Sequence, residues 1–354
     1  MQIDFHHAVT YVTARLAGFD PDRARIIAHA AQYVDDATED DLIKFKNGAL
    51  FKRICSSHKM YSFDNMRTLD SHRTWLPFHF LPGNDGKAAE TVHQGKFIDK
   101  IVCRPDSFVA QDLVRLTIQQ QDRPYALHRL GVTMHVYADT WAHQGFAGVL
   151  HDINKTDHID DLGNSGILDR MKEKILHFAE QAVPPLGHGQ AFTFPDMPYL
   201  KWRYENGRGK EITRNNTEDF VEAAHRMCMA MQRYLAKDAD APVNGLSSDN
   251  RDKIKTMFEK FDDEDGDERH KKWLQAIAKG AFPELRDDPP LTYVIGENEG
   301  SWKHESLGTV DEEQRYPYPA GFLGSNWKFF HDAIQAHRFQ VIHEILPKYG
   351  ICAA

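Results

Sequence analysis

Residues 125–145 read YALHRLGVTMHVYADTWAHQG, and they decide both the fold and the chemistry that we expect of this chain. On an α-helix, at about 100° per residue, four side chains that can bind metal fall within one narrow arc. These are His128, His135, Asp139 and His143. The other positions are mostly small or apolar, which indicates a helix buried on most sides. Because a buried carboxylate is costly unless it is paired or bound to metal, the pattern predicts a metal site in the core. A hydrogen-bonded His–Asp network without metal is the alternative.

Helical periodicity also marks the segments around this stretch. Apolar spacing predicts a helix that ends at Gly18, a second helix over residues 21–36 and a third over residues 217–235. The turn-forming pair Asn206-Gly207 lies between two strand-like segments, which predicts a β-hairpin near 201–214. We therefore expect a mainly α fold: a multi-helix bundle with a metal site in its core, this small hairpin and a less regular C-terminal region.

The domain organisation follows from a change in composition after about residue 237. Residues 238–250, DADAPVNGLSSDN, are typical of a linker. The sequence thus predicts a helical metal-binding core over residues 1–237. Residues 238–354 are predicted to form a C-terminal extension that packs on this core.

Composition excludes several classes of protein. The chain has 354 residues, of which 41% are hydrophobic and 27% charged, and its formal net charge is −9. Its apolar runs are far shorter than the roughly 18–20 residues of a membrane helix. The acidic balance disfavours duplex nucleic acid as a partner. The first residues lack the basic start and apolar run of a signal peptide, so we expect a cytoplasmic protein. Four scattered cysteines without C-x-x-C fit reduced thiols.

Histidine is over-represented, with 20 residues in the chain and seven between His128 and His188. Imidazole binds metals and titrates near neutral pH, so this surplus points to metal or acid–base chemistry. Candidate ligands outside the central helix are Asp35 and Asp36, at a helix end where the macrodipole favours a cation. The others are His6, His58 and His188. We assign a supporting role in orienting ligands to three further residues, His79, His128 and Asp196.

The segment HVYADTWAHQ (135–144) resembles the core helix of the zinc-dependent phospholipase C and single-strand nuclease superfamily. Members carry H-x-x-x-D followed by another histidine. This motif is preceded in the chain by an early histidine, then by an aspartate that ends an early helix, and then by a lone histidine. His6, Asp36 or Asp35, and His58 match that order. The final histidine is closer to the aspartate here than in those enzymes. The pieces FHHAVTY, AQYVDDAT, PFHFLPG and GHG…PD also resemble a bacterial family of uncharacterised function, over most of the first 235 residues.

The resemblance implies a metal-dependent hydrolase that acts on a small phosphoester or a phospholipid-like substrate. Zinc is the implied metal, in one to three ions, with Mn, Fe or Mg as alternatives. Asp139 and His135 would act in catalysis through a metal-bound water. The implied ligands are His6, Asp35, Asp36, His58, His135, Asp139 and His143. We add His188 to this set because it stands between two glycines, where its imidazole is freely presented.

Two other functions remain open at the level of sequence. One is a metal-stabilised helical binding protein without turnover, in which every coordination position is closed. The other is an HD-type phosphohydrolase, because the dipeptides His151-Asp152 and His331-Asp332 occur in the chain.

Overall fold

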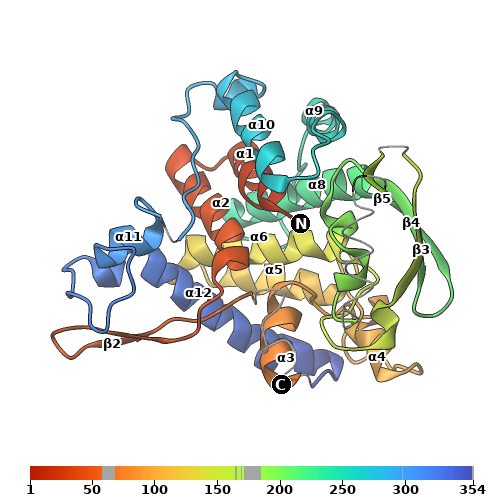
Figure 1. Cartoon of the computed structure of the whole chain (residues 1–354), viewed down its shortest axis with the longest axis horizontal. Coiled ribbons are helices and arrows are strands. Elements are labelled where there is room, and N and C mark those ends of the chain that lie inside the picture. The colour runs from red at the N-terminus through yellow and green to blue at the C-terminus, as the bar shows by residue number, and fades with distance from the viewer. Residues whose placement is uncertain (58–67, 164–165, 169, 171–184, 297, 353–354) are drawn as a thin grey trace.

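The computed structural model describes residues 1–57, 68–163, 166–168, 170, 185–296 and 298–352. This part of the chain is mainly α-helical, which confirms the predicted fold class. The helix α6 (Ala126–Ala142) runs through the middle of the bundle, and other helices pack around it (Figure 1). These are α2 (Pro21–Asp36), α5 (Phe108–Gln119), α8 (Asn216–Ala236) and α12 (Asn326–Gln340).

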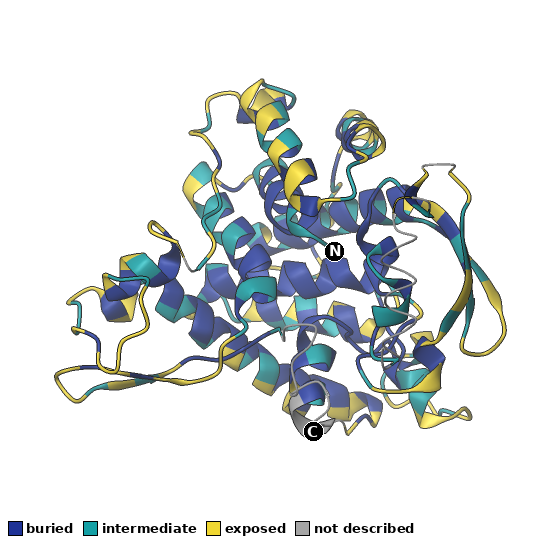
Figure 2. Ribbon diagram, in the orientation of Figure 1, coloured by how far each residue is buried: buried dark blue, intermediate teal, exposed yellow. Residues whose placement is uncertain are grey.

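Helix α6 is buried on all sides, as its apolar and small residues predict. Every residue in it except Leu127 is buried, and the helix appears dark blue along its length in Figure 2. The buried set includes His135, which is 0% exposed, and Asp139, which is 1% exposed. The ligand-type arc of the helix therefore faces protein and not bulk solvent.

A glycine allows α2 and α6 to approach closely. A Cβ atom at Gly131 would lie 2.4 Å from the carbonyl oxygen of Ile27 and 2.7 Å from Cβ of Ala30. One turn further along α6, His135 reaches the carbonyl oxygen of Ala31 at 2.8 Å. The small residue at 131 thus sets the distance between the two helices that carry Asp35, His135 and Asp139.

We expect Gly131→Ala to lower the free energy of unfolding, although alanine favours an isolated helix by about 1 kcal/mol. The new methyl group would meet backbone, which cannot move aside cheaply, so the net loss should be about 1–3 kcal/mol. Chemical denaturation measures it. The matched control is Gly324→Ala, because a Cβ there meets nothing within 4 Å. Equal stability of the two variants would contradict this account of the helix contact.

The N-terminal segments begin and end close to the predicted residues. A π-helical turn, η1 (Asp4–Val9), leads into α1 (Thr10–Ala17), which ends at Gly18 with φ of 111°. Asp20 then caps α2 by accepting a hydrogen bond from the Arg23 amide at 2.9 Å, and Pro21 opens the helix. Every residue of η1 is buried.

The predicted hairpin is present as β4 (Lys201–Asn206) and β5 (Glu211–Asn215). A further antiparallel strand, β3 (Thr156–Asp161), pairs with β4 and makes the sheet three-stranded. Its sequence, TDHIDD, is acidic and lacks apolar alternation, so periodicity gave no signal for it. A separate two-stranded ribbon consists of β1 (Leu42–Lys44) and β2 (Leu50–Lys52), and it projects from the bundle (Figure 1).

The C-terminal part contains long loops, as predicted, but also well-formed helices. Asp265 caps α10, where Asp267 and Glu268 occupy the first turn and complement the helix dipole. No helix in the described ranges could cross a membrane. The remaining helices are α3 (Thr68–Phe78), α4 (Phe97–Ile101), α9 (Ser248–Lys260), α10 (Gly266–Ala278) and α11 (Trp302–Leu307). Short 3-10 and π turns are η3 (Asn84–Gly86), η4 (Asp152–Asn154), η5 (Gly189–Ala191), η6 (Phe194–Asp196), η7 (Pro283–Leu285), η8 (Phe322–Gly324), η9 (Val341–Ile345) and η10 (Leu346–Tyr349).

The largest apolar cluster joins residues from both ends of the chain. Phe5 packs against Phe220 and Phe258, with ring centroids 5.4 and 6.0 Å away, and Phe258 contacts Trp273. A second cluster forms around Trp327 and α12, beside the end of α2. These apolar contacts fix the positions of η1, α2 and α6 relative to one another, so their polar side chains meet at fixed positions.

Candidate metal centre

Histidine and aspartate side chains from segments far apart in the sequence meet beside the centre of α6. The C-terminal half of α6 supplies His135 and Asp139, and His143 caps its end. Most of these side chains are buried, while Asp35 and His188 are partly exposed. The other members are His6 of η1, Asp35 of α2, His79 after α3, His188 before η5 and Asp196 of η6.

Within the described residues, these side chains form three groups whose ligand atoms lie within 4.8 Å of one another. His135 belongs to two of the groups, so two of the three are adjacent. The three groups are His6, Asp35 and His135; His79, His135 and Asp139; and His143, His188 and Asp196.

The Asp139 carboxylate connects the cluster. Its Oδ1 atom lies 2.7 Å from the α-amino nitrogen of Met1 and 3.2 Å from His6 Nε2. Its Oδ2 atom lies 3.3 Å from His135 Nε2 and 3.4 Å from His79 Nδ1. Within 3.4 Å this carboxylate therefore faces three imidazoles and one amine, which makes it the acidic group that these four side groups share.

A second carboxylate, Asp196, holds the other end of the cluster. Its Oδ1 atom lies 3.3 Å from His143 Nε2 and 3.1 Å from the Met1 amine. Its Oδ2 atom lies 3.4 Å from His188 Nε2. The Met1 amine thus contacts both carboxylates and links the two ends of the cluster.

Backbone carbonyls fix the orientation of four of the imidazoles. His135 Nδ1 donates to the carbonyl of Ala31 at 2.8 Å, and His79 Nε2 donates to the carbonyl of Ser56 at 2.9 Å. His143 Nδ1 donates at 2.7 Å to the carbonyl of residue 79, and His188 Nδ1 donates at 2.8 Å to that of Phe192. A carbonyl oxygen only accepts, so the bonded nitrogen of each neutral ring carries the proton. The second nitrogen of each ring then presents a lone pair to the carboxylates.

Burial favours the neutral form of four cluster imidazoles, those of His6, His79, His135 and His188. It lowers the pKa of His6 and of His188 to about 4, and it lowers the pKa of His135 well below the usual range. In the neutral rings, His135 Nε2 and His79 Nδ1 approach within 3.3 Å although neither has a hydrogen to donate. Facing lone pairs of this kind repel one another unless a cation lies between them. The donor set therefore fits a metal ion.

The carboxylates differ in their electrostatics. Burial alone would raise the pKa of Asp139, but the imidazoles and the Met1 amine hold it well below the usual range. Burial and the charge of Asp139 raise the pKa of Asp35. For the Met1 amine, burial opposes the charged form, yet Asp139 and Asp196 raise its pKa to about 11. A single ammonium thus faces several acidic groups, which leaves negative charge for a bound cation to balance.

The structure brings together most of the predicted ligands: His6, Asp35, His135, Asp139, His143 and His188. We expected His79 and Asp196 only to orient ligands. Instead, His79 directly faces the shared carboxylate of Asp139, and Asp196 directly faces two histidines. The sequence contains no signal for the Met1 amine, because a terminal amine has no motif.

Two predicted residues lie elsewhere, and one cannot be placed. Asp36 accepts hydrogen bonds from Tyr293 and, at 3.4 Å, from Gln32, and it belongs to none of the three groups. His128 pairs with Asn326 at 3.1 Å, on the far half of α6. His58 lies outside the described residues.

The fold and the site define a mainly helical protein with a largely buried His/Asp cluster whose ligand atoms are close enough together to hold a metal ion. The chain belongs to a family of unknown function, DUF6765, whose model matches residues 1–345. A search of curated proteins and a search of solved structures gave no match.

Proposed function

We propose that this protein is a metal-dependent hydrolase, with zinc as the metal and a small phosphoester as the substrate. The observation that carries the proposal is the set of four imidazoles whose lone pairs converge on shared carboxylates. Mixed histidine and aspartate ligands without cysteine are common where a metal must activate water.

His135, His79 and Asp139 would hold one ion, with His6 and Asp35 beside them. His143, His188 and Asp196 would hold another. Metal bound there supplies a water of lowered pKa and a positive charge for phosphoryl oxygen atoms. The carbonyls of Ala31 and Ser56 keep His135 and His79 in the orientation that the ion needs.

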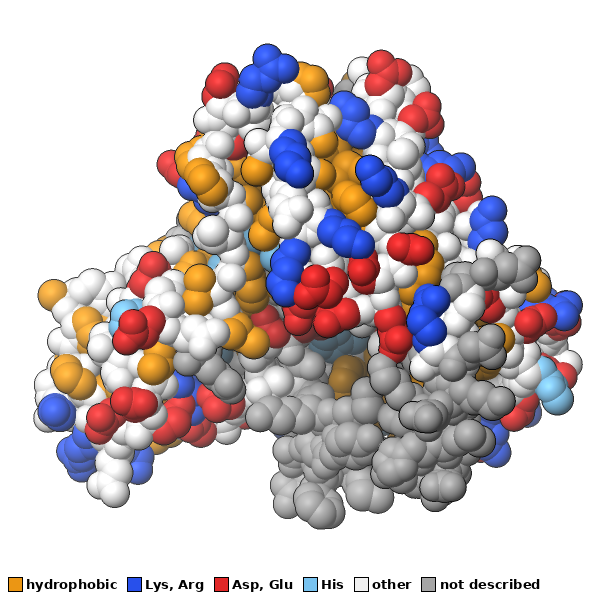
Figure 3. All heavy atoms as spheres, turned by 45° about the horizontal axis from the view of Figure 1, so that its top comes forward, with side chains coloured by type: hydrophobic (Ala, Val, Ile, Leu, Met, Phe, Trp, Pro, Cys, Tyr) orange, Lys and Arg blue, Asp and Glu red, His pale blue; other side chains and the backbone are white. Residues whose placement is uncertain are grey.

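The cluster borders a cavity, which favours catalysis over a closed structural site. The Asp35 side chain is 30% exposed and lines a cavity of about 180 Å³. On the face shown in Figure 3, Asp and Glu side chains border a hollow in which histidine atoms are visible. A substrate can therefore approach the Asp35 side of the cluster. The acidic net charge of −9 favours a small ester over a long polyanion.

Two observations weigh on the alternatives. A binding protein without turnover needs a closed coordination sphere, whereas Asp35 is accessible from the cavity. The HD-type phosphohydrolase needs its His-Asp pair at the metal. His151 and Asp152 are both exposed at the start of η4, and His331 and Asp332 likewise belong to none of the three ligand groups.

The metal-loaded protein should hydrolyse at least one phosphomonoester or phosphodiester in a panel assayed with zinc, manganese and magnesium. His135→Ala should reduce that rate more than about 100-fold, because even partners that only orient ligands cost 10–100-fold. The matched control is His151→Ala, which removes an exposed histidine and should leave the rate unchanged. If wild type and His135→Ala show equal background rates for every ester, the non-catalytic alternative is favoured.

A further inference from the structure

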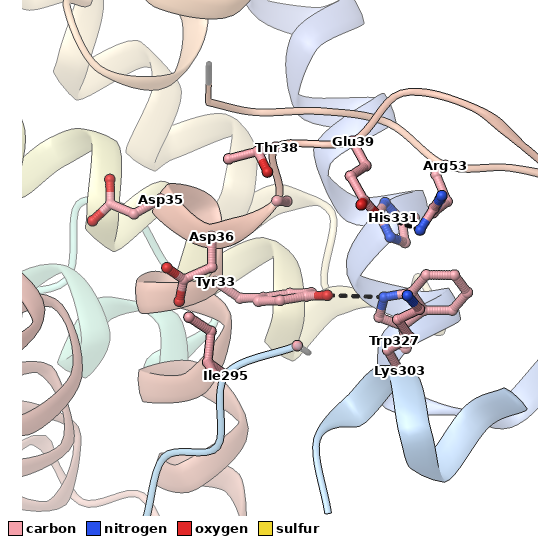
Figure 4. Close-up of a pocket in the computed structure, with 12 residues that line it drawn as sticks. Tyr33, Asp35, Asp36, Thr38, Glu39, Arg53, Ile295, Lys303, Trp327 and His331 are labelled. Carbon is pink, nitrogen blue, oxygen red and sulfur yellow. Dashed lines mark hydrogen bonds and ion pairs between the residues drawn. The ribbon is translucent and has the colours of Figure 1, made fainter. Parts of the chain in front are cut away.

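The cavity beside Asp35 has two chemically different ends (Figure 4). The carboxylates of Asp35 and Asp36 lie at one end, and Asp35 also belongs to the metal-ligand cluster. Side chains with nitrogen donors, His331 and Lys303 among them, lie at the other end beside Tyr33 and Trp327. A molecule whose reacting group binds at the cluster would place the rest of its structure among these donors.

One donor at the far end has no partner within the described part of the chain. His331 is 3% exposed, and its Nδ1 atom accepts a hydrogen bond from the Ile54 amide at 3.2 Å. Because Nδ1 accepts, the ring proton resides on Nε2, and Nε2 forms no hydrogen bond there. A buried donor without a partner costs about 1–3 kcal/mol. Because His331 lines the cavity, a ligand oxygen atom that reaches Nε2 through a small movement of the lining side chains would recover that cost.

Tyr33 offers a second neutral donor. Its Oη atom accepts a hydrogen bond from Trp327 Nε1 at 3.0 Å, so its own hydrogen is available to a ligand. Burial raises the pKa of Tyr33 above its usual range and lowers the pKa of His331 to about 3. Both groups are therefore uncharged donors at neutral pH.

The charged residues at this end are already compensated. Arg53 directs its guanidinium nitrogens to three carboxylates, Asp41, Glu39 and Glu312. Glu312 also pairs with Lys303. With Asp35 and Asp36 at the other end, acidic groups outnumber cations around the cavity, so a second phosphate or carboxylate would be repelled.

We propose that this cavity binds the uncharged, hydroxyl-bearing alcohol portion of the phosphoester, with His331 and Tyr33 as specificity-determining residues. A hydroxyl group both accepts from such donors and donates to the neighbouring carboxylates, whereas a hydrocarbon does neither. The volume of about 180 Å³ is below the roughly 300–1,000 Å³ of drug-sized sites, so the group is small. This inference rests on the proposed function, because the cluster must hold the phosphoryl end.

Calorimetric titration of the zinc-loaded chain with two esters of equal length tests the proposal. Glycerol 3-phosphate carries two hydroxyl groups, and propyl phosphate carries none. We expect glycerol 3-phosphate to bind about tenfold more tightly, as one or two added hydrogen bonds allow. 3-Phosphoglycerate, in which a carboxylate replaces the terminal hydroxymethyl group and one hydroxyl group remains, should bind more weakly than glycerol 3-phosphate.

A matched variant assigns the effect to the cavity. In His331→Asn, the amide oxygen can still accept from the Ile54 amide while the Nε2 donor is removed. Its dissociation constant for glycerol 3-phosphate should rise about fivefold, and that for propyl phosphate should not change. Lys328→Met serves as the control on the same helix, because Lys328 pairs with Asp332 and does not line the cavity.

Equal affinity of the wild type for both esters, or binding of neither, would overturn the inference without any use of the variant. A tenfold preference that survives undiminished in His331→Asn would also overturn the role of that residue. If the protein prefers glycerol 3-phosphate but hydrolyses no ester, the cavity assignment stands and the proposed function is refuted. If the protein hydrolyses both esters without preference, the proposed function stands and the cavity assignment is refuted.

Discussion

Asp139→Ala should lose bound metal and reduce the free energy of unfolding by about 3–5 kcal/mol, the cost of breaking a buried charge network by removing one member. Asp139 is 1% exposed and contacts the Met1 amine, His6, His135 and His79. Its removal deprives the cluster of its shared carboxylate and leaves the amine buried with less compensation. Elemental analysis and chemical denaturation measure the two effects.

The control for this variant is Asp160→Ala. Asp160 forms an ion pair with Arg203 at 2.9 Å, but both side chains are more than 40% exposed. Its loss should cost less than about 1 kcal/mol and leave metal content unchanged. Full metal occupancy together with an unchanged unfolding curve in Asp139→Ala would refute the ligand role.

Removal of metal by a chelator should lower the melting temperature of the wild type by about 4–8 °C. A ligand that binds only the folded state adds roughly 4 kcal/mol of stability when its free concentration is about 1,000 times its dissociation constant. For a chain of this size, each kcal/mol corresponds to about 2 °C or less near the midpoint. Differential scanning calorimetry, on a sample whose metal content has been measured beforehand, records the shift.

Readdition of zinc should restore the original melting temperature, and Asp139→Ala should respond to neither treatment. A wild-type sample shown to contain metal, but with a melting temperature indifferent to the chelator, would contradict a contribution of the cluster to stability. The pair of proteins separates loss of metal from any direct effect of the chelator on the chain.

The part of the site on α6 could be predicted from sequence because one helix places its own residues at known angles. His135 and Asp139 are one turn apart on a helix whose other faces are apolar, and both are buried as expected. The same reasoning included His128, which lies on the same arc but about two turns away from His135, so it contacts Asn326 instead. An arc fixes direction around a helix axis and not position along it.

Residues outside α6 were harder to predict because their positions depend on packing between segments. Asp35 and Asp36 are adjacent at the end of α2, and only the contact of α2 with α6 decides that Asp35 faces the cluster. His79 reaches it because the helix before it ends at Phe78 and its ring bonds to the Ser56 carbonyl. Neither contact involves a local sequence pattern. The strand β3 escaped prediction for the same reason, since pairing with β4 and not periodicity defines it.

The most direct test of the account is an anomalous difference map from a crystal of the protein purified without a metal-affinity tag, recorded on both sides of the zinc absorption edge. The account predicts a peak bounded by His135 Nε2, His79 Nδ1 and Asp139 Oδ2, and a second beside His143, His188 and Asp196. The protein for this experiment is produced in medium that contains zinc and is never exposed to a chelator. A map without a peak at Asp139 would then contradict the central claim that this cluster is a metal centre.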